Sequence, residues 1–177
     1  FDIPVDHLMG APILTPYFQP LVHHHEDEYV AVSPDHGSVN RVRKFAEKLD
    51  IPLAIIDKRR PKANVSEVMN IIGDVKGKTC IIYDDIVDTA GTLCQAAQAI
   101  KNEGATAVYA CVSHGVLSDP ALERIENSCL EELLLLNTIP APKEYKGDKI
   151  RYIDSASHFA KAIKCIYHEA PISNLLF

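Results

Sequence analysis

The sequence has no long apolar run and no excess of positive charge. None of its hydrophobic stretches approaches the ~20 residues that a membrane-spanning helix needs, and the opening FDIPVDHLMG has neither the basic nor the apolar region of a signal peptide. The formal net charge is -6, which argues against nucleic acid as a partner because a phosphate backbone is held by an excess of Lys and Arg. We therefore expect a cytoplasmic protein with no nucleic-acid or membrane partner.

Disulfide and zinc motifs are also missing. The five cysteines are odd in number, widely spaced and without a CxxC pair, so we expect most of them to be small core residues. The 177 residues, 47% of them apolar, suffice for one compact domain. The first residue is Phe rather than Met, which leads us to expect a truncated or cleaved polypeptide.

Short apolar runs rich in β-branched and aromatic residues alternate with segments of helical period. The runs predict strands buried on both faces, at 29–32, 53–56, 79–83, 107–112 and 133–136. The periodic segments predict helices at 39–49, 92–102, 121–127 and 156–168. This alternation predicts an α/β fold, with an open, mostly parallel sheet and helices on both of its faces.

Ligands of such folds bind beyond the carboxyl ends of the strands. The sequence has strongly polar segments at those places, namely 33–38, 57–62, 84–92 and 113–115. The stretch 58–78 is long for a connection, which favours a functional role. We interpret His114 as a hydrogen-bonded structural residue, and the run 23–25 of three histidines as a solvated loop, with adventitious metal binding as the less favoured alternative.

Residues 88–92, Asp-Thr-Ala-Gly-Thr, follow a predicted buried strand and open a predicted helix. Backbone N–H groups at such a place face an anion at the positive end of the helix dipole. Gly91 allows close approach of the backbone, and Thr89 and Thr92 can donate hydrogen bonds. A threonine N-cap with a turn glycine is the plainer interpretation. The acidic residues just upstream favour a cradle for a phosphate monoester.

Asp84 and Asp85 are those acidic residues. Two adjacent carboxylates at a strand end repel each other, and they are tolerated where they bind a cation or a hydroxyl-bearing ligand, or where one faces solvent. The pair therefore indicates a sugar diol or Mg²⁺, and an acidic strand end that caps a neighbouring helix is the alternative we favour less. Together with the cradle, the pair matches a pentose 5-phosphate.

Residues 58–62 place four cations within five positions after the second predicted strand. Taken alone, the cluster would be a solvated basic hairpin. Beside a site for Mg²⁺ and phosphate, a cationic loop suits phosphoryl transfer, because catalysis there consists mainly of positioning and of neutralising charge on the transferred group. Asp35, which precedes Gly37, can supply a further metal or hydroxyl ligand.

The segment IIYDDIVDTAGT resembles the phosphoribosyl pyrophosphate-binding signature shared by type I phosphoribosyltransferases and ribose-phosphate diphosphokinases. Further segments along nearly the whole chain resemble the diphosphokinases: VSPDHGSVNRVRKFAEKL, IIDKRRPKANVSEVMNIIGDVKGK, YACVSHGVLSDPALERI and LLLLNTIP. The resemblance implies a type I phosphoribosyltransferase-like fold. It further implies that residues 1–177 correspond to a C-terminal domain, without the homologous N-terminal domain of the family.

The activity implied by the resemblance is that of a transferase of nucleotide biosynthesis. Such an enzyme moves pyrophosphate from MgATP to the 1-hydroxyl of ribose 5-phosphate and gives phosphoribosyl pyrophosphate and AMP. Lys58 and Arg60 would be the catalytic cations, with Arg59 at a more variable place. Asp35 would bind Mg²⁺. The pyrophosphate region would be lined by Asp35, His36, Gly37 and Ser38.

The resemblance also implies how the substrate and effectors are held. The ribose hydroxyls would bind to Asp84 and Asp85. The 5-phosphate would be held by Asp88, Thr89, Ala90, Gly91 and Thr92. Ser173 matches a serine of the C-terminal tail that forms a regulatory site for phosphate and ADP between subunits, and the family assembles as homo-oligomers, hexamers or related assemblies built from dimers.

The sequence departs from the family pattern at two places. Gly37-Ser38 replaces the usual Gly-Gly, and residues 174–177 after Ser173 are altered, which puts regulation in doubt. Two other functions remain open. A type I phosphoribosyltransferase would need a hood over the nucleobase, which no segment supplies, and a non-catalytic regulatory relative would not need Lys58, Arg60 or the acidic pair.

Overall fold

The computed structural model describes residues 1–59 and 68–176. The helices are α1 Ala11–Val22, α2 Val39–Leu49, α3 Gly91–Asn102, α4 Ala121–Glu126 and α5 Ala156–Tyr167, with 3₁₀ turns η1 Glu26–Glu28 and η2 Ser173–Leu175. The strands are β1 Tyr29–Ser33, β2 Leu53–Arg59, β3 Val68–Ile72, β4 Thr79–Val87, β5 Ala107–Gly115, β6 Glu132–Leu136 and β7 Ile150–Ile153.

The seven strands form one sheet in the order β3-β2-β1-β4-β5-β6-β7. All neighbours pair in parallel except β2 and β3, which pair antiparallel from Ile55↔Ile72 to Arg59↔Val68. The chain thus leaves β1 toward β2 and β3 on one side and reaches β4 to β7 on the other. The predicted open, mostly parallel sheet is confirmed, with an antiparallel strand added at one edge.

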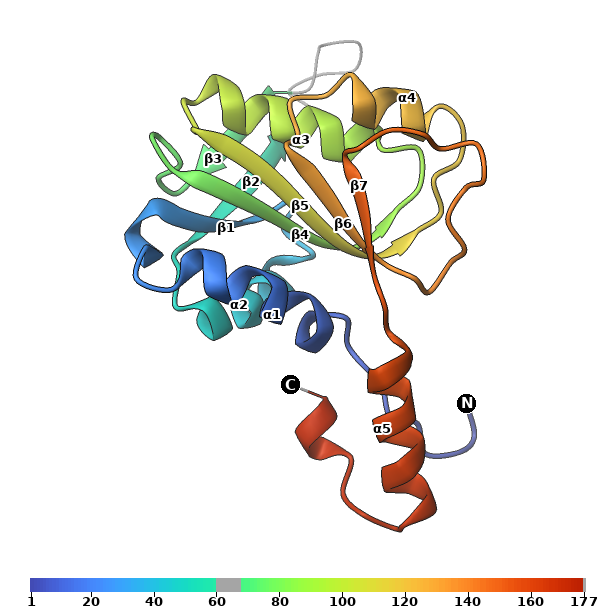
Figure 1. The fold of residues 1–177 in the computed structure, drawn as a ribbon. Helices are drawn as coiled ribbons and strands as arrows, with labels where there is room; N and C mark the ends of the chain where they lie inside the picture. Colours follow the sequence, from blue (N-terminus) through green and yellow to red (C-terminus); the bar gives the residue numbers. More distant parts are fainter. Residues whose placement is uncertain (60–67, 177) are drawn as a thin grey trace.

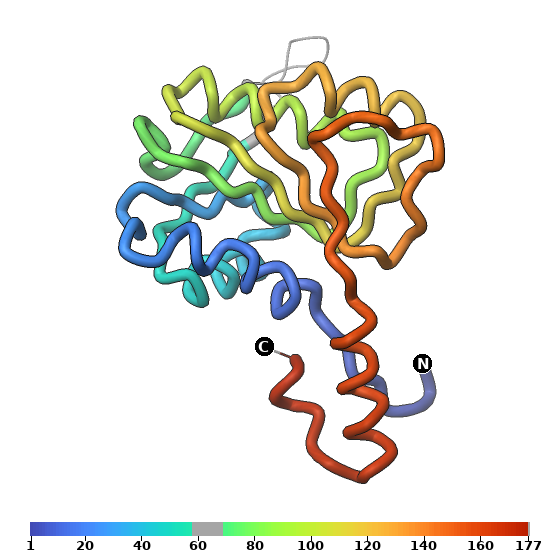
Figure 2. The backbone as a smooth tube through the Cα atoms, viewed as in Figure 1, coloured from blue at the N-terminus to red at the C-terminus, as the bar shows by residue number. Residues whose placement is uncertain are grey.

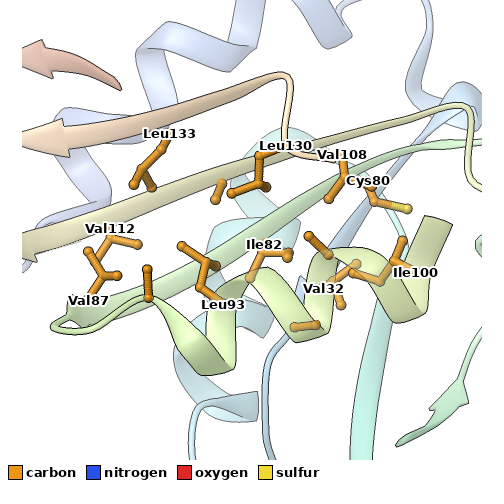
Figure 3. Packing of buried hydrophobic residues seen from close by; sticks show 14 of the residues in the cluster. Val32, Cys80, Ile82, Val87, Leu93, Ile100, Val108, Val112, Leu130 and Leu133 are labelled. Carbon is orange, nitrogen blue, oxygen red and sulfur yellow. The ribbon is translucent and has the colours of Figure 1, made fainter. Parts of the chain in front are cut away.

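Helices cover both faces of this sheet, α3 and α4 on one and α1 and α2 on the other (Figure 1). The first face buries a core in which Ile82 and Val112 of the strands meet Leu93 and Ile100 of α3 (Figure 3). The second face buries a separate core that joins Leu14 and Phe18 of α1 to Phe45 of α2. Because both faces are covered, the central strands read as continuous apolar runs, which is why the sequence revealed them.

Helix α5 departs from this arrangement. It follows β7 and projects away from the sheet beside the N-terminal segment, and the chain then turns back through η2 (Figures 1 and 2). Ile163, Ile166 and Tyr167 are largely exposed on it. Within the described part of the chain, none of the helices is long and apolar enough to span a bilayer.

Several elements differ from the sequence prediction. Helix α1 was missed because Pro16 and Pro20 lie inside it, and β7 was missed because none of its side chains is fully buried. The stretch 58–78 was predicted to be a connection, but 68–72 form β3, whose pairing with β2 supplies the hydrogen bonds that a lone segment would lack. Cys80 and Cys111 are buried core residues as expected, whereas the other three cysteines are half-buried. The three histidines at 23–25 are exposed, as expected of a solvated loop.

Candidate functional site

The candidate site lies where the strand order reverses. Strands β1 and β4 are neighbours, paired from Tyr29↔Thr79 to Val32↔Ile82, although the chain visits β2 and β3 between them. Loops that leave two such strands in opposite directions open a crevice at their carboxyl ends, which is the usual ligand site of open α/β sheets. The segments 33–38 and 84–92 therefore come together at this edge of the sheet.

The acidic pair lies inside β4 rather than after it, contrary to the prediction. The strand continues to Val87 because its pairing with β5 runs on to Asp84↔Val112 and Val87↔Gly115. In a strand, successive side chains alternate between faces. Asp84 is accordingly about one-fifth exposed and Asp85 about half exposed, at 21% and 51% of the side chain.

Arg41 binds both carboxylates. Its Nη1 donates to Asp85 Oδ2 at 2.7 Å, and its Nη2 lies 3.3 Å from Asp84 Oδ1 and donates to Ser38 Oγ at 2.9 Å. Ser38 and Arg41 are one helical turn apart at the start of α2, so they share a face of the helix. The guanidinium neutralises part of the repulsion between the two acids and fixes their orientation.

Asp84 is the electrostatically unusual member of the pair. Burial raises the pKa of Asp84 to about 6, and the charge of Asp85 acts in the same direction. The backbone N–H of Asp85, which donates to Asp84 Oδ1 at 2.9 Å, and the Arg41 guanidinium both oppose this rise. The surroundings of Asp84 therefore disfavour its ionised form, and a hydroxyl donor or a cation would stabilise that form.

Residues 88–92 form a tight turn between β4 and α3. Ala90 is the N-cap of α3, in the left-handed conformation at φ 58°, and no side chain caps the helix. The helix begins at Gly91, one residue before the predicted start. The first N–H groups of a 12-residue helix are thus open to a ligand at its positive end, as a phosphate cradle requires.

The loop after β1 brings a further carboxylate to the crevice. Asp35 is exposed, and its Oδ1 accepts the backbone N–H of Ser38 at 2.8 Å. Ser38 Oγ in turn lies 3.5 Å from Asp84 Oδ1, so the loop is tied to the acidic pair. His36 Nε2 lies 2.8 Å from Oδ1 of Asp57, a residue of β2.

Other predicted site residues are placed less completely. The backbone of Lys58 pairs with Met69 within the β2 and β3 ladder, while Arg60 falls outside the described residues. Ser173 lies in η2, on the projecting α5 arm rather than at the crevice (Figure 1). Across residues 1–59 and 68–176, no three His, Cys, Asp or Glu side chains gather into a metal site.

A cleft of about 160 Å³ adjoins the acidic pair. Asp85 and Arg41 line it together with His7 of the N-terminal segment and His158 of the projecting helix α5. His114 contributes from β5, and its Nδ1 is 2.8 Å from Thr138 Oγ1, which confirms that this ring is hydrogen-bonded. The N-terminal segment and α5 therefore form part of the wall of this cleft.

Arg41 is the residue that the sequence analysis missed. It stands among other cations of an amphipathic helix, and 43 and 44 positions separate it from the acids. One signal was available, since a cation in the first turn of a helix opposes the helix dipole. Such a cation calls for an acidic partner elsewhere in the fold.

Comparisons with known proteins point to one family. A family model described as "Phosphoribosyl synthetase-associated domain" matches residues 59–177. The proteins named ribose-phosphate pyrophosphokinase from Clostridium perfringens and from Caldanaerobacter subterraneus are each 58% identical over 175 residues, which is 99% of this chain and 55% of theirs. The chain thus spans about half the length of the curated relatives it matches.

Two solved structures show the same fold. Phosphoribosylpyrophosphate synthetase from Mycobacterium smegmatis superposes with a TM-score of 0.84 at 36% identity, over 96% of this chain and 54% of that one. An adenine phosphoribosyltransferase superposes with a TM-score of 0.54 at 14% identity, over 71% and 76% of the two chains, which indicates a shared fold alone. The expected type I phosphoribosyltransferase-like fold is confirmed.

Proposed function

The chain belongs to the phosphoribosyl synthetase-associated domain family, and on that premise we propose that it forms the ribose 5-phosphate side of a ribose-phosphate diphosphokinase. The reaction is the transfer of a pyrophosphoryl group from ATP to the 1-hydroxyl of ribose 5-phosphate, with release of AMP, for nucleotide biosynthesis. One observation carries the proposal. The acidic pair, oriented by Arg41, stands at one end of β4 directly before an uncapped helix N-terminus.

The acidic pair suits the two ribose hydroxyls. Asp85 Oδ2 is engaged by Arg41, which leaves Oδ1 of this half-exposed side chain to accept from a hydroxyl. Asp84 accepts from Arg41 and from a backbone N–H, so its orientation is fixed before the ligand arrives. Hydrogen bonds to a carboxylate are stronger than those between neutral groups, so the pair would hold the ribose hydroxyls firmly.

The turn at 88–92 suits the 5-phosphate. The left-handed Ala90 turns the chain so that the N–H groups of Gly91 and Thr92 open α3, and the hydroxyls of Thr89 and Thr92 are exposed beside them. A dianionic group is stabilised there by the helix dipole and by several donors at once. With the ribose on the acidic pair, the sugar phosphate would lie along the end of β4.

Asp35 fits Mg²⁺ carried by the ATP phosphates. Mg²⁺ is commonly held by one or two carboxylates together with phosphate oxygens and water, and Asp35 offers one exposed carboxylate oriented by Ser38 N–H. When bound, the ion would neutralise charge on the phosphates. Gly37 lies in the same loop and lets its backbone approach the pyrophosphate, and His36 would line the same region.

In the transfer, the 1-hydroxyl of the bound ribose attacks the β-phosphorus and AMP leaves. Lys58 lies in β2, at the same edge of the sheet as the crevice, and Arg60 follows two positions later in the sequence. Both would bring a positive charge close to the transferred pyrophosphoryl group. Electrostatic stabilisation of this kind is the main contribution of proteins to phosphoryl transfer. ATP is then the second substrate. We further propose that the protein assembles as a homo-oligomer and that phosphate and ADP are effectors that act through Ser173.

The test measures AMP release from ATP in the presence of ribose 5-phosphate. The chain is assayed alone and joined to the part of the Clostridium perfringens relative that it does not cover. We expect release from the joined protein, loss of release with Asp85→Asn, and no change with Asp148→Asn, an exposed carboxylate far along the chain. The chain alone should bind ribose 5-phosphate but release AMP slowly.

Two outcomes would contradict the proposal. Consumption of a nucleobase with phosphoribosyl pyrophosphate, without AMP release from ATP, would identify a type I phosphoribosyltransferase instead. Rapid AMP release by the 177 residues alone would contradict the assignment of this chain to the ribose 5-phosphate side.

A further inference from the structure

Arg124 of α4 lies against the turn that we assign to the phosphate. Its Nη1 donates a hydrogen bond to the carbonyl oxygen of Thr89 at 2.9 Å. A Cβ atom placed on Gly91 would lie 3.4 Å from the same nitrogen. The guanidinium therefore touches the backbone of the turn next to the first residue of α3, although it comes from 35 positions further along the chain.

The helix that carries Arg124 is fixed to the helix that the turn opens. Ala121 and Ile125 of α4 are fully buried in the same core as Leu93 of α3. The carbonyl oxygen of Arg124 also accepts from Cys94 Sγ, in the first turn of α3, at 3.6 Å. The guanidinium thus comes from a helix that packs directly against α3.

Arg124 has no acidic partner among the residues that the structure describes. Among residues 1–59 and 68–176, no carboxylate forms an ion pair with it, and its side chain is exposed. A guanidinium has five N–H donors, and the Thr89 carbonyl engages one of its nitrogens. In a chain with a net charge of -6, an uncompensated guanidinium beside open helical N–H groups is a local attraction for an anion.

We propose that Arg124 is a phosphate-binding residue of this site, which contacts the phosphate group of the bound sugar phosphate while its bond to Thr89 holds the turn around that group. The inference rests on the proposed function and assigns to its substrate a contact from a different helix. A planar guanidinium donates to two phosphate oxygens at once and carries a full positive charge, whereas the backbone N–H groups of the turn are uncharged donors.

The first test is the affinity of the chain for ribose 5-phosphate, measured by isothermal titration calorimetry. Arg124→Gln should weaken binding by about 10- to 100-fold, the range for loss of a charged hydrogen bond. The affinity of Arg124→Lys should lie between those of the wild type and Arg124→Gln, because lysine keeps the positive charge and loses the paired N–H donors of the guanidinium. The matched control is Lys101→Gln, which removes an exposed cation bonded to a backbone carbonyl at the other end of α3, and it should leave the affinity unchanged.

The second test separates contact with the phosphate from support of the turn. A free phosphate monoester loses its second proton near pH ~6, and an adjacent guanidinium lowers that pKa. A ³¹P NMR titration of bound ribose 5-phosphate should therefore give a lower pKa in the wild type than in Arg124→Gln. Weaker binding by the variant with the same phosphate pKa would show a supporting role alone and overturn the proposal.

Inorganic phosphate serves as a second probe that does not depend on the sugar. If the wild type binds inorganic phosphate through Arg124 but does not bind ribose 5-phosphate, the anion site stands and the proposed function is wrong. If Arg124→Gln binds both probes as tightly as the wild type does, the inference is wrong and the proposed function is untouched. If the wild type binds neither probe, both are wrong.

Discussion

Replacing Asp84 by Asn should stabilise the protein at neutral and alkaline pH. Burial raises the pKa of Asp84 from 3.8 to about 6, so the native protein holds this proton more tightly than the unfolded chain does. The contribution of Asp84 to stability is therefore fully present below pH 3.8 and is lost as the pH rises to about 6. Above that pH the native state contains an ionised carboxylate that its surroundings disfavour.

The size of the effect follows from the pKa shift. A rise of the pKa from 3.8 to about 6 corresponds to about 3 kcal/mol of destabilisation. We expect the Asn variant to recover about 1–3 kcal/mol of this. Its amide oxygen would still accept from the Asp85 N–H, but the attraction between the carboxylate and Arg41 would be lost. For a domain of this size that is a rise in Tm of about 2–4 °C per kcal/mol. Urea unfolding followed by circular dichroism at pH 8 and pH 4 measures the change in the free energy of unfolding.

The gain should be present at pH 8 and absent near pH 4, where the wild-type carboxyl is protonated in the native protein. Asp148→Asn, which neutralises an exposed carboxylate, should change stability by less than about 0.5 kcal/mol at both pH values. An Asp84→Asn variant no more stable than the wild type at pH 8, or a gain that does not depend on pH, would refute the reasoning. The affinity for ribose 5-phosphate should fall even as stability rises, because binding sites often contain groups that lower the stability of the fold.

Three further outcomes are expected. Arg41→Met should lower the free energy of unfolding at pH 8 by about 1–3 kcal/mol, because it leaves the half-buried acidic pair without its cation. The loss should be smaller below pH 4, and urea unfolding at the two pH values measures it. Gly73→Ala should destabilise by about 1–3 kcal/mol, since φ is 121° and the new Cβ would lie 2.8 Å from Ala54 Cβ. Gly77→Ala, with positive φ but open space, should lose less stability, and urea unfolding of both variants measures the difference. Lys58→Ala should lower kcat of the joined protein by about 100-fold or more with a smaller change in KM, and an unchanged kcat would remove Lys58 from the mechanism.

The sequence by itself determined the central strands, most helices and the two contiguous segments that we propose bind ribose 5-phosphate. The strands were legible because side chains buried on both faces leave continuous apolar runs, as in 79–83. The acidic pair and the turn at 88–92 could be singled out because they are contiguous, so the chemistry we propose for them depends on one strand end and one helix start. Asp35 was placed correctly in the loop after β1 for the same local reason.

The tertiary structure alone decided what lies across from these segments. Arg41 reaches Asp84 and Asp85 because β1 and β4 pair in parallel and α2 packs on the face below them, an arrangement made only after the chain has passed through β2 and β3. Arg124 reaches Thr89 because α3 and α4 share one core. Both cations lie more than 30 positions from their partners, and no local pattern encodes such a pairing, since it depends on which helix faces which strand end once the sheet has formed.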